Sequence, residues 1–352
     1  MSASPPVESA VSPGANPVLV ELTRGPAVES RHRGAAAVVD GRGKLAAAWG
    51  DIECLIFPRS AIKPLQALAV IESGAADAYE LGDAELALAC ASHSGEPKHV
   101  DAVVGWLARI GLGVADLECG AHAPYSLAAN EALWRAGKAP TAAHNNCSGK
   151  HSGMLSAARH LDEPTRGYIR FDHPAQQRWI GTVGEMCGVE LAKAPRATDG
   201  CSIPTLAMPI RAIALGMARL ATQEGLAAER RAAAKRVLAA VAARPDMVSG
   251  SGRFGTVVME RSGGRILLKG GAEGVYCAAV PDLGLGVALK IDDGAARAAE
   301  VAVAAILRYL GALDDASWTA LAPLCRPILR NWNDIEVGEM RAAEGWLVKG
   351  EK

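Results

Sequence analysis

The sequence predicts a mixed α/β protein of the α+β type, in which one antiparallel sheet is built from both ends of the chain. Three observations lead to this fold class. Short β-type apolar runs occur near the amino terminus and again after residue 250, and helical patterns fill most of the chain between them. Gly, Asp and Pro separate the later runs, so tight turns are expected to join antiparallel strands. A helical lobe is then inserted in the middle, and helices cover one face of the sheet.

The first elements are short strands and one apolar helix. Asp40-Gly41-Arg42-Gly43 supplies a turn between two strands, and the helix after Ser60 ends at Gly74. Pro64 is compatible with this helix because it falls in the first turn. The strands are expected at 18–22, 35–39 and 45–49.

The middle of the chain has helical periodicity up to Pro245, where the pattern changes to short β-type runs. A strong amphipathic helix follows at 295–310, and the last forty residues have a mixed pattern. The middle helices are expected at about 98–110, 128–136, 149–161, 174–187, 205–221 and 225–243. The later strands are expected at 256–260, 265–269, 274–279 and 286–291.

The domain prediction is a disordered tail at 1–16 followed by one catalytic domain at 17–352. The sheet part comprises about 17–60 and 250–352, and the helical part about 61–249. The opening residues carry Ser, Pro and Ala without a basic segment before an apolar block, so they do not resemble a signal peptide. The expected location is therefore cytoplasmic.

Composition excludes several classes of protein. The 352 residues carry a formal net charge of -1 and no basic block, which argues against a nucleic-acid surface or a polybasic membrane anchor. No apolar run reaches the roughly eighteen residues of a membrane span. The eight cysteines are scattered from Cys54 to Cys325, so we expect reduced thiols, some of which could be metal ligands or nucleophiles.

Ser60-Ala61-Ile62-Lys63 is the most informative motif of the chain. Residues three apart share one helix face, so the Ser60 hydroxyl and the Lys63 amine can meet, and the amine can act as the base. Penicillin-recognising enzymes use the same spacing. The alternative is an ordinary surface pair, because one such motif is expected by chance in a chain of this length.

Two further segments could complete a serine–lysine site. Ser92 and Ser94 lie in a polar cluster after a buried apolar run, where their hydroxyls could relay a proton or simply cap a turn. Lys269 precedes Gly270 and Gly271 at the end of a predicted strand, where glycines allow a ligand to approach the backbone. Ser-x-x-Lys enzymes line their site with a Lys-x-Gly strand in this order.

Two thiols could bind a metal ion. Cys147-x-x-Lys150 and Asp199-Gly200-Cys201 lie on Gly- and Ser-containing segments, and two such thiols could share a soft divalent ion such as zinc. The alternative is a pair of structural cysteines. By ordinary chemistry the additional ligands would be His144, His151 and Asp199.

The dinucleotide-binding pattern Gly-x-Gly-x-x-Gly is matched in residue types by Gly250-Ser251-Gly252-Arg253-Phe254-Gly255. That pattern needs a strand before it and a helix after it, and here a helix is expected before it and a strand after it. We therefore expect a flexible loop that borders an active site.

These motifs together resemble the rhizobial-type, or class 3, L-asparaginases of the asparaginase II family, and the likeness covers nearly the whole chain. The resemblance implies a fold like that of serine β-lactamases and glutaminases, a homodimer, and hydrolysis of L-asparagine to L-aspartate and ammonia. The stretches that carry it are Phe57-Pro58-Arg59-Ser60-Ala61-Ile62-Lys63, Cys90-Ala91-Ser92-His93-Ser94-Gly95-Glu96, Asn145-Asn146-Cys147-Ser148-Gly149-Lys150-His151 and Asp199-Gly200-Cys201-Ser202.

The resemblance also implies roles for individual residues. Ser60 with Lys63 forms one serine–lysine pair, and Ser92 with Lys269 forms a second. Cys147, Lys150 and Cys201 become the ligands of a zinc ion that assists substrate binding. None of these seven positions is altered in this chain.

The expected mechanism is a two-step acyl transfer. Ser60 attacks the side-chain amide carbon, Lys63 takes its proton, and water later hydrolyses the ester. Arg59 is a candidate ligand of the substrate carboxylate, because a guanidinium binds carboxylates in a bidentate manner. Two alternatives remain open: a β-lactamase or D-amino-acid peptidase, and a non-catalytic zinc-dependent protein that binds amino acids.

Overall fold

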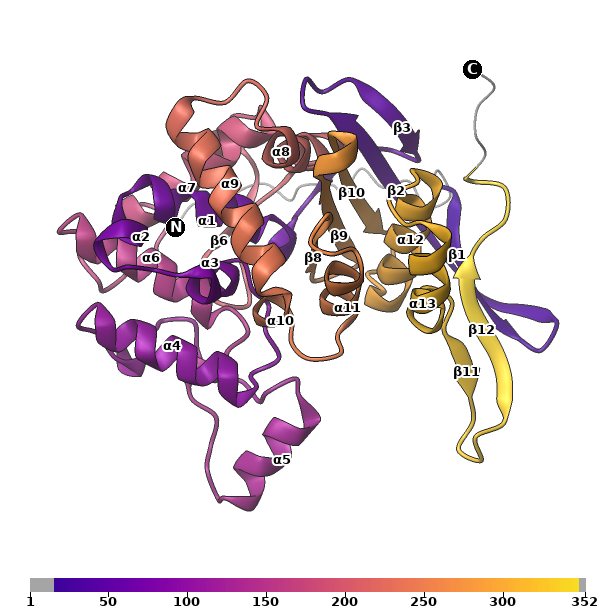
Figure 1. Ribbon diagram of the computed structural model, residues 1–352, viewed down its shortest axis with the longest axis horizontal. Coiled ribbons are helices and arrows are strands. Elements are labelled where there is room, and N and C mark those ends of the chain that lie inside the picture. The colour runs from indigo at the N-terminus through magenta and orange to yellow at the C-terminus, as the bar shows by residue number, and fades with distance from the viewer. Residues whose placement is uncertain (1–15, 348–352) are drawn as a thin grey trace.

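The computed structural model describes residues 16–347, so the tail predicted for 1–16 lies outside the described residues except for Asn16. An eight-stranded sheet dominates one half of the molecule (Figure 1). Its strands are β1 (Val18–Arg24), β2 (Ala27–Asp40), β3 (Leu45–Trp49), β8 (Leu267–Gly271), β9 (Val275–Val280), β10 (Leu285–Ile291), β11 (Ile328–Arg330) and β12 (Glu336–Ala342).

Both ends of the described chain contribute to this sheet, as the sequence predicts. The strand order is β11-β12-β1-β2-β10-β9-β8, with β3 also paired to β2. Every neighbouring pair is antiparallel. The predicted antiparallel sheet with an inserted helical lobe is therefore confirmed.

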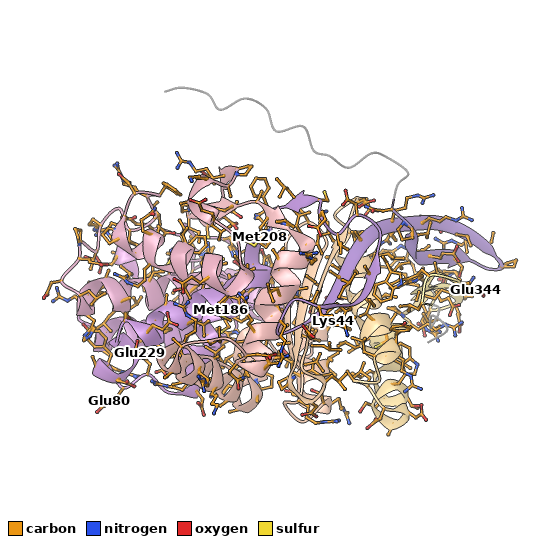
Figure 2. The ribbon with its side chains drawn as sticks, turned by 90° about the horizontal axis from the view of Figure 1, so that it is seen from above. Lys44, Glu80, Met186, Met208, Glu229 and Glu344 are labelled. Atoms are coloured by element: carbon orange, nitrogen blue, oxygen red, sulfur yellow. The ribbon has the colours of Figure 1, made fainter. Side chains whose placement is uncertain are left out.

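Helices cover both faces of the sheet, so the prediction of one covered face is wrong. Helix α8 (Ile210–Thr222) packs against β2, β9 and β10, and α12 (Ala296–Tyr309) packs against β1, β9, β10 and β12. Figure 2 shows the strands between the helical part that holds Met186 and Met208 and the C-terminal helices. The reason is visible in β9, whose residues are all buried. Such a strand needs apolar partners above and below the sheet.

The helical lobe closely follows the periodicity of the sequence. Helix α7 has the predicted bounds, and most other helices begin or end within a few residues of the expected positions. The helices that precede the last sheet strands are α1 (Lys63–Glu72), α2 (Ala75–Ala78), α3 (Asp83–Ala89), α4 (Pro97–Arg109), α5 (Leu127–Arg135), α6 (Ser148–His160), α7 (Pro174–Cys187), α8, α9 (Ala228–Ala243), α10 (Pro245–Val248) and α11 (Phe254–Arg261).

The helix predicted at 205–221 begins only at Ile210. Two short strands, β6 (Pro204–Leu206) and β7 (Met208–Pro209), precede it and pair with β5 (Arg196–Thr198) and β4 (Leu55–Ile56). Proline has no backbone N–H and its ring clashes with a preceding helical turn, so Pro209 is tolerated before or within the first turn of the helix but not deeper inside it.

The strand predicted at 256–260 is also wrong, because these residues lie in α11. The β-branched residues Thr256, Val257 and Val258 suggest a strand, but Phe254 and Val258 are four residues apart and share one helix face. Both are buried on that face together with Met259. Burial therefore outweighs local propensity. The mixed C-terminal region contains α13 (Asp315–Cys325) and the β11–β12 hairpin.

No helix within residues 16–347 is long and apolar enough to cross a membrane. The domain boundaries expected from the sequence remain predictions.

Candidate active site

A cavity of about 420 Å³ lies between the helical lobe and strands β8 and β9. Its wall is formed by residues from segments that are far apart in the sequence. Six of the eight residues with predicted catalytic, substrate-binding or metal-binding roles reach this wall: Arg59, Ser60, Ser92, Cys147, Cys201 and Lys269. Lys63 and Lys150 are buried directly behind it, since each contacts one of these residues.

Ser92 lies between two lysine amines. Its Oγ is 2.8 Å from Nζ of Lys269 and 3.1 Å from Nζ of Lys63. Ser92 follows α3, and its backbone N–H donates to Val248 O, which fixes the serine at the cavity wall. The structure thus joins the predicted pair Ser92–Lys269 and links Lys63 to it.

Ser60 has different surroundings. It lies in a 3₁₀ turn (Arg59–Ile62), and Lys63 is the first residue of α1. Lys63 Nζ contacts Ala91 O, Ser92 Oγ and Cys147 Sγ, and no hydrogen bond of the Ser60 hydroxyl exists within residues 16–347. The structure therefore does not bring Ser60 and Lys63 into direct hydrogen bonding, although it places Ser60 on the cavity wall.

Lys269 lies inside β8 and is buried, with Cys277 of β9 as its cross-strand partner. Burial and the nearby charge of Lys63 hold the pKa of the Lys269 amine well below its usual range. A lysine with a lowered pKa can act as a general base near neutral pH. Lys269 Nζ also lies 2.7 Å from Gly270 O, which orients the amine.

Gly271 explains why a glycine follows this lysine. A Cβ at position 271 would lie 2.6 Å from Pro58 O and 3.1 Å from Ala61 N. Only glycine allows β8 to approach the turn that carries Ser60 so closely. The Lys-Gly-Gly sequence thus brings Lys269 and the Ser60 turn together.

The two predicted thiols lie beside the serine–lysine cluster. Cys147 precedes α6, and Cys201 lies in the turn between β5 and β6. Lys150 Nζ is 3.0 Å from Cys201 Sγ, and Lys63 Nζ is 3.2 Å from Cys147 Sγ. A hydrogen bond from Cys147 and the charge of Lys150 lower the pKa of the Cys201 thiol, and these two effects outweigh burial.

These donors fit a soft divalent ion better than they fit a hard one. Two buried sulfurs, one of them with thiolate character, and an amine share one side of the cavity. Within residues 16–347 no group of three His, Cys, Asp or Glu side chains could hold a metal, so a metal ion at the two sulfurs would need a further donor such as the Lys150 amine. His144 and His151 contact Thr141 and Tyr168 instead.

Arg59 and Asp199 form a bidentate ion pair across the cavity wall. Arg59 Nε and Nη2 each lie 3.0 Å from a carboxylate oxygen of Asp199. Burial alone would raise the pKa of Asp199, but the hydrogen bonds from Arg59 hold it below its usual range. Arg59 has a φ of 51°, a left-handed conformation that is uncommon for a residue other than glycine. The ion pair stabilises this conformation and connects the Ser60 turn to the Cys201 segment.

The sequence gives little indication of several other cavity residues. Arg253 lies in the glycine-rich loop that was expected to border an active site, and it does line the cavity. Glu300 is the only acidic residue of α12, and it lines the cavity together with Ala296 and Ala299. The remaining unpredicted wall residues with polar side chains are His122, Tyr125, Asn145, Asn146, Ser249 and Tyr276.

A serine beside two lysine amines, at the junction of an antiparallel sheet and a helical lobe, is typical of the serine hydrolases that carry a Ser-x-x-Lys motif. The chain belongs to the L-asparaginase II family, whose sequence pattern matches residues 20–342. The family predicted from the sequence is confirmed. Membership indicates an amidohydrolase that acts on a small molecule.

Solved structures with similar chain paths are distant. A structure of Mglu in its native form is 14% identical with a TM-score of 0.46, and the match covers 81% of this chain and 66% of that chain. A β-lactamase from Mycobacterium bovis is 14% identical with a TM-score of 0.39, and the match covers 79% of this chain and 94% of that chain.

D-alanine carboxypeptidase AmpC from Burkholderia cenocepacia is 12% identical with a TM-score of 0.37, and the match covers 77% of this chain and 93% of that chain. The chain spans less than two thirds of the length of Mglu. No curated protein matches the chain.

Proposed function

We propose that this protein hydrolyses L-asparagine to L-aspartate and ammonia through a serine ester. One observation carries the proposal within the family: Ser92 Oγ lies 3.1 Å from the Lys63 amine and 2.8 Å from the Lys269 amine, on the wall of a cavity that also holds Ser60. Amide hydrolysis needs a hydroxyl nucleophile and groups that move protons to and from it, and this cluster supplies both.

In the first step Ser60 Oγ attacks the side-chain amide carbon, and its proton passes to Lys63. The carbon–nitrogen bond then breaks, and the leaving nitrogen takes a proton from Ser92, which in turn takes a proton from Lys63. Ammonia leaves and an aspartyl ester remains on Ser60. Water then hydrolyses this ester and regenerates the serine.

The developing oxyanion needs donors that are already in position. The backbone N–H of Ser60 and one N–H of strand β8 are the candidates, because Gly271 holds the strand close to the turn that carries Ser60. Removal of one such donor typically lowers kcat by about 10²- to 10³-fold.

A zinc ion would be held by Cys147, Lys150 and Cys201. When bound, zinc would supply a positive centre that helps to orient the substrate, and Lys150 would have to lose its proton to bind it. The proton transfers above use only the serines and lysines. Chelation followed by metal analysis of the purified protein tests this ligand set.

The position of Ser92 also favours a second assignment, in which Ser92 attacks and Lys269 takes its proton. The Ser60 hydroxyl has no hydrogen-bond partner within residues 16–347, which leaves it free to meet a substrate, whereas the hydroxyl oxygen of Ser92 already has two amine partners. We therefore assign attack to Ser60 and proton transfer to Ser92.

The experiment is ammonia release from L-asparagine, L-glutamine and buffer alone, with wild type, Ser60→Ala, Ser92→Ala and the distant control Ser30→Ala. A diazoketone analogue of asparagine would then mark the nucleophile, whose adduct is mapped by mass spectrometry. An adduct on Ser60 supports the assignment, and an adduct on Ser92 reverses it.

Activity on a chromogenic cephalosporin without activity on L-asparagine would instead support the β-lactamase or D-amino-acid peptidase reading. Binding of L-asparagine without any turnover, unaffected by Ser60→Ala and lost in Cys147→Ser, would support the non-catalytic amino-acid-binding reading. We also propose a homodimer in the cytoplasm, and light scattering of the purified protein tests the dimer.

A further inference from the structure

The charged side chains on the cavity wall divide into two groups. Arg59 and Asp199 are bonded to each other, and Lys269 is bonded to Ser92 and Gly270. The other two charged residues, Arg253 and Glu300, make no ion pair and no side-chain hydrogen bond with any residue in the range 16–347.

Arg253 and Glu300 come from different elements. Arg253 immediately precedes α11 and is exposed, so its guanidinium can move. Glu300 lies on α12, one turn after Ala296, and both residues line the cavity. A carboxylate on this face of α12 therefore points toward the cavity wall among small side chains.

Tyr276 connects these two residues to the serine–lysine cluster. It lies on β9 directly opposite Gly270, the residue after Lys269. Burial raises the pKa of the Tyr276 phenol, and the charges of Glu300 and Arg253 act on it with opposite signs. All three residues line the same cavity as Lys269 and Gly270.

Glu300 is the more informative of the pair because it is partly buried. Burial raises the pKa of its carboxyl group, and Arg253 is the charge that opposes this effect. Removing a carboxylate from water without a partner costs free energy, which a bound cation would recover. The charge pattern is therefore that of a site for a ligand with one positive and one negative group.

We propose that Glu300 accepts hydrogen bonds from the α-ammonium group of the substrate and that Arg253 donates to its α-carboxylate. The side-chain amide then points toward Ser60 and Ser92. This inference rests on the proposed function, because it takes a free α-amino acid amide as the substrate. It assigns the α-carboxylate to Arg253 because the fork of Arg59 is already bonded to Asp199.

Two consequences concern specificity. An ammonium contact, a carboxylate contact and the reacting amide are three points of attachment, so the L-enantiomer is distinguished from the D-enantiomer. An asparagine whose α-nitrogen is acylated, inside a peptide or as a free N-acyl derivative, lacks the α-ammonium charge, so Glu300 would remain without a partner and these compounds would be poor substrates.

The test compares L-asparagine with two analogues that each lack one group. Succinamate lacks the α-ammonium group, and β-alaninamide lacks the α-carboxylate. The variants are Glu300→Gln and Arg253→Met. Matched controls are Glu260→Gln on α11 and Arg297→Met on α12, both exposed and outside the cavity wall.

For Glu300→Gln, kcat/KM for L-asparagine should fall about 10- to 100-fold, the usual range for a lost hydrogen bond to a charged group. Its kcat/KM for succinamate should change less than about threefold, because the group that Glu300 binds is absent from that substrate. For Arg253→Met, kcat/KM should fall by a similar factor on L-asparagine and should change little on β-alaninamide. The controls Glu260→Gln and Arg297→Met should match wild type on all three substrates.

Equal losses on L-asparagine and on the matched analogue would overturn the inference, since they indicate a general structural effect. The contrary result for the carboxylate is that Arg59→Lys loses kcat/KM on L-asparagine but not on β-alaninamide, while Arg253→Met loses neither. That result would assign the α-carboxylate contact to Arg59 and overturn the role proposed for Arg253. If wild type releases no ammonia from L-asparagine, the proposed function fails independently. Calorimetric binding of L-aspartate then decides the inference: binding lost in Glu300→Gln supports it, and unchanged or absent binding overturns it.

Discussion

The approach of β8 to the turn that carries Ser60 can be tested with a single methyl group. In Gly271→Ala the new Cβ would lie 2.6 Å from Pro58 O, whereas such atoms ordinarily stay 3.4 Å or more apart. Either the strand or the turn must therefore move by about 0.8 Å, the difference between the ordinary and the available distance. A displacement of about 1 Å in a catalytic group costs about 100-fold in rate. Overpacking of this kind also costs about 1–3 kcal/mol of unfolding free energy.

The assay is ammonia release from L-asparagine together with urea denaturation. Gly181→Ala is the matched control, because no atom lies within 4 Å of the added Cβ and the residue is inside α7. It should keep full activity and gain about 0.5–1 kcal/mol in stability. A Gly271→Ala protein that folds and retains kcat/KM within about threefold of wild type would refute the reasoning, because the turn would then tolerate the shift.

Three further predictions concern the same cavity. Burial and the charge of Lys63 hold the pKa of the Lys269 amine well below its usual range, and a charged Lys269 would oppose proton uptake by Lys63, so kcat/KM should rise with pH through that lowered value and then level off. In Lys269→Arg the side chain stays charged, so kcat/KM should be low and should not rise over the same pH range. Arg59→Lys should lose about 1–3 kcal/mol in urea denaturation, because the bidentate contact with Asp199 is lost, whereas Arg297→Lys at an exposed position of α12 should change little. Cys201→Ser should reduce bound zinc, measured by elemental analysis after purification, while Cys325→Ser outside the cavity keeps the wild-type metal content. Equal zinc in both variants would contradict the proposed ligand set.

Much of the fold could be predicted because its helices have regular periodicity. Helix α7 begins and ends where the pattern predicts, as Pro174 starts it and Gly188 adopts a left-handed conformation after its end. The region 256–260 was mispredicted because the β-branched residues there favour a strand locally, whereas the burial of Phe254 and Val258 together requires a helix.

The site was predictable in its members but not in its contacts. The motif Ser60-x-x-Lys63 predicts a hydrogen bond within one turn, yet the Lys63 amine contacts Ser92, whose position depends on the packing of α3 against the rest of the lobe. Arg253 and Glu300 could not be recognised together, because no local pattern connects a loop residue with a helix residue 47 positions later. Such pairs become visible only in three dimensions.

The pairing of β1 with β12 has a consequence for how the protein is made. Val20 lies opposite Ala342, so the first strand, which can pair with β2 early, gains its second partner only when β12 leaves the ribosome. Ser60, Lys63 and Ser92 are synthesised long before Lys269, so the second lysine partner of Ser92 is missing until β8 emerges. Contacts so distant in sequence slow folding. The same pairing brings the two ends of the described chain together, so a circular permutant that joins them and opens at the exposed Gly137 should fold and keep the cavity intact.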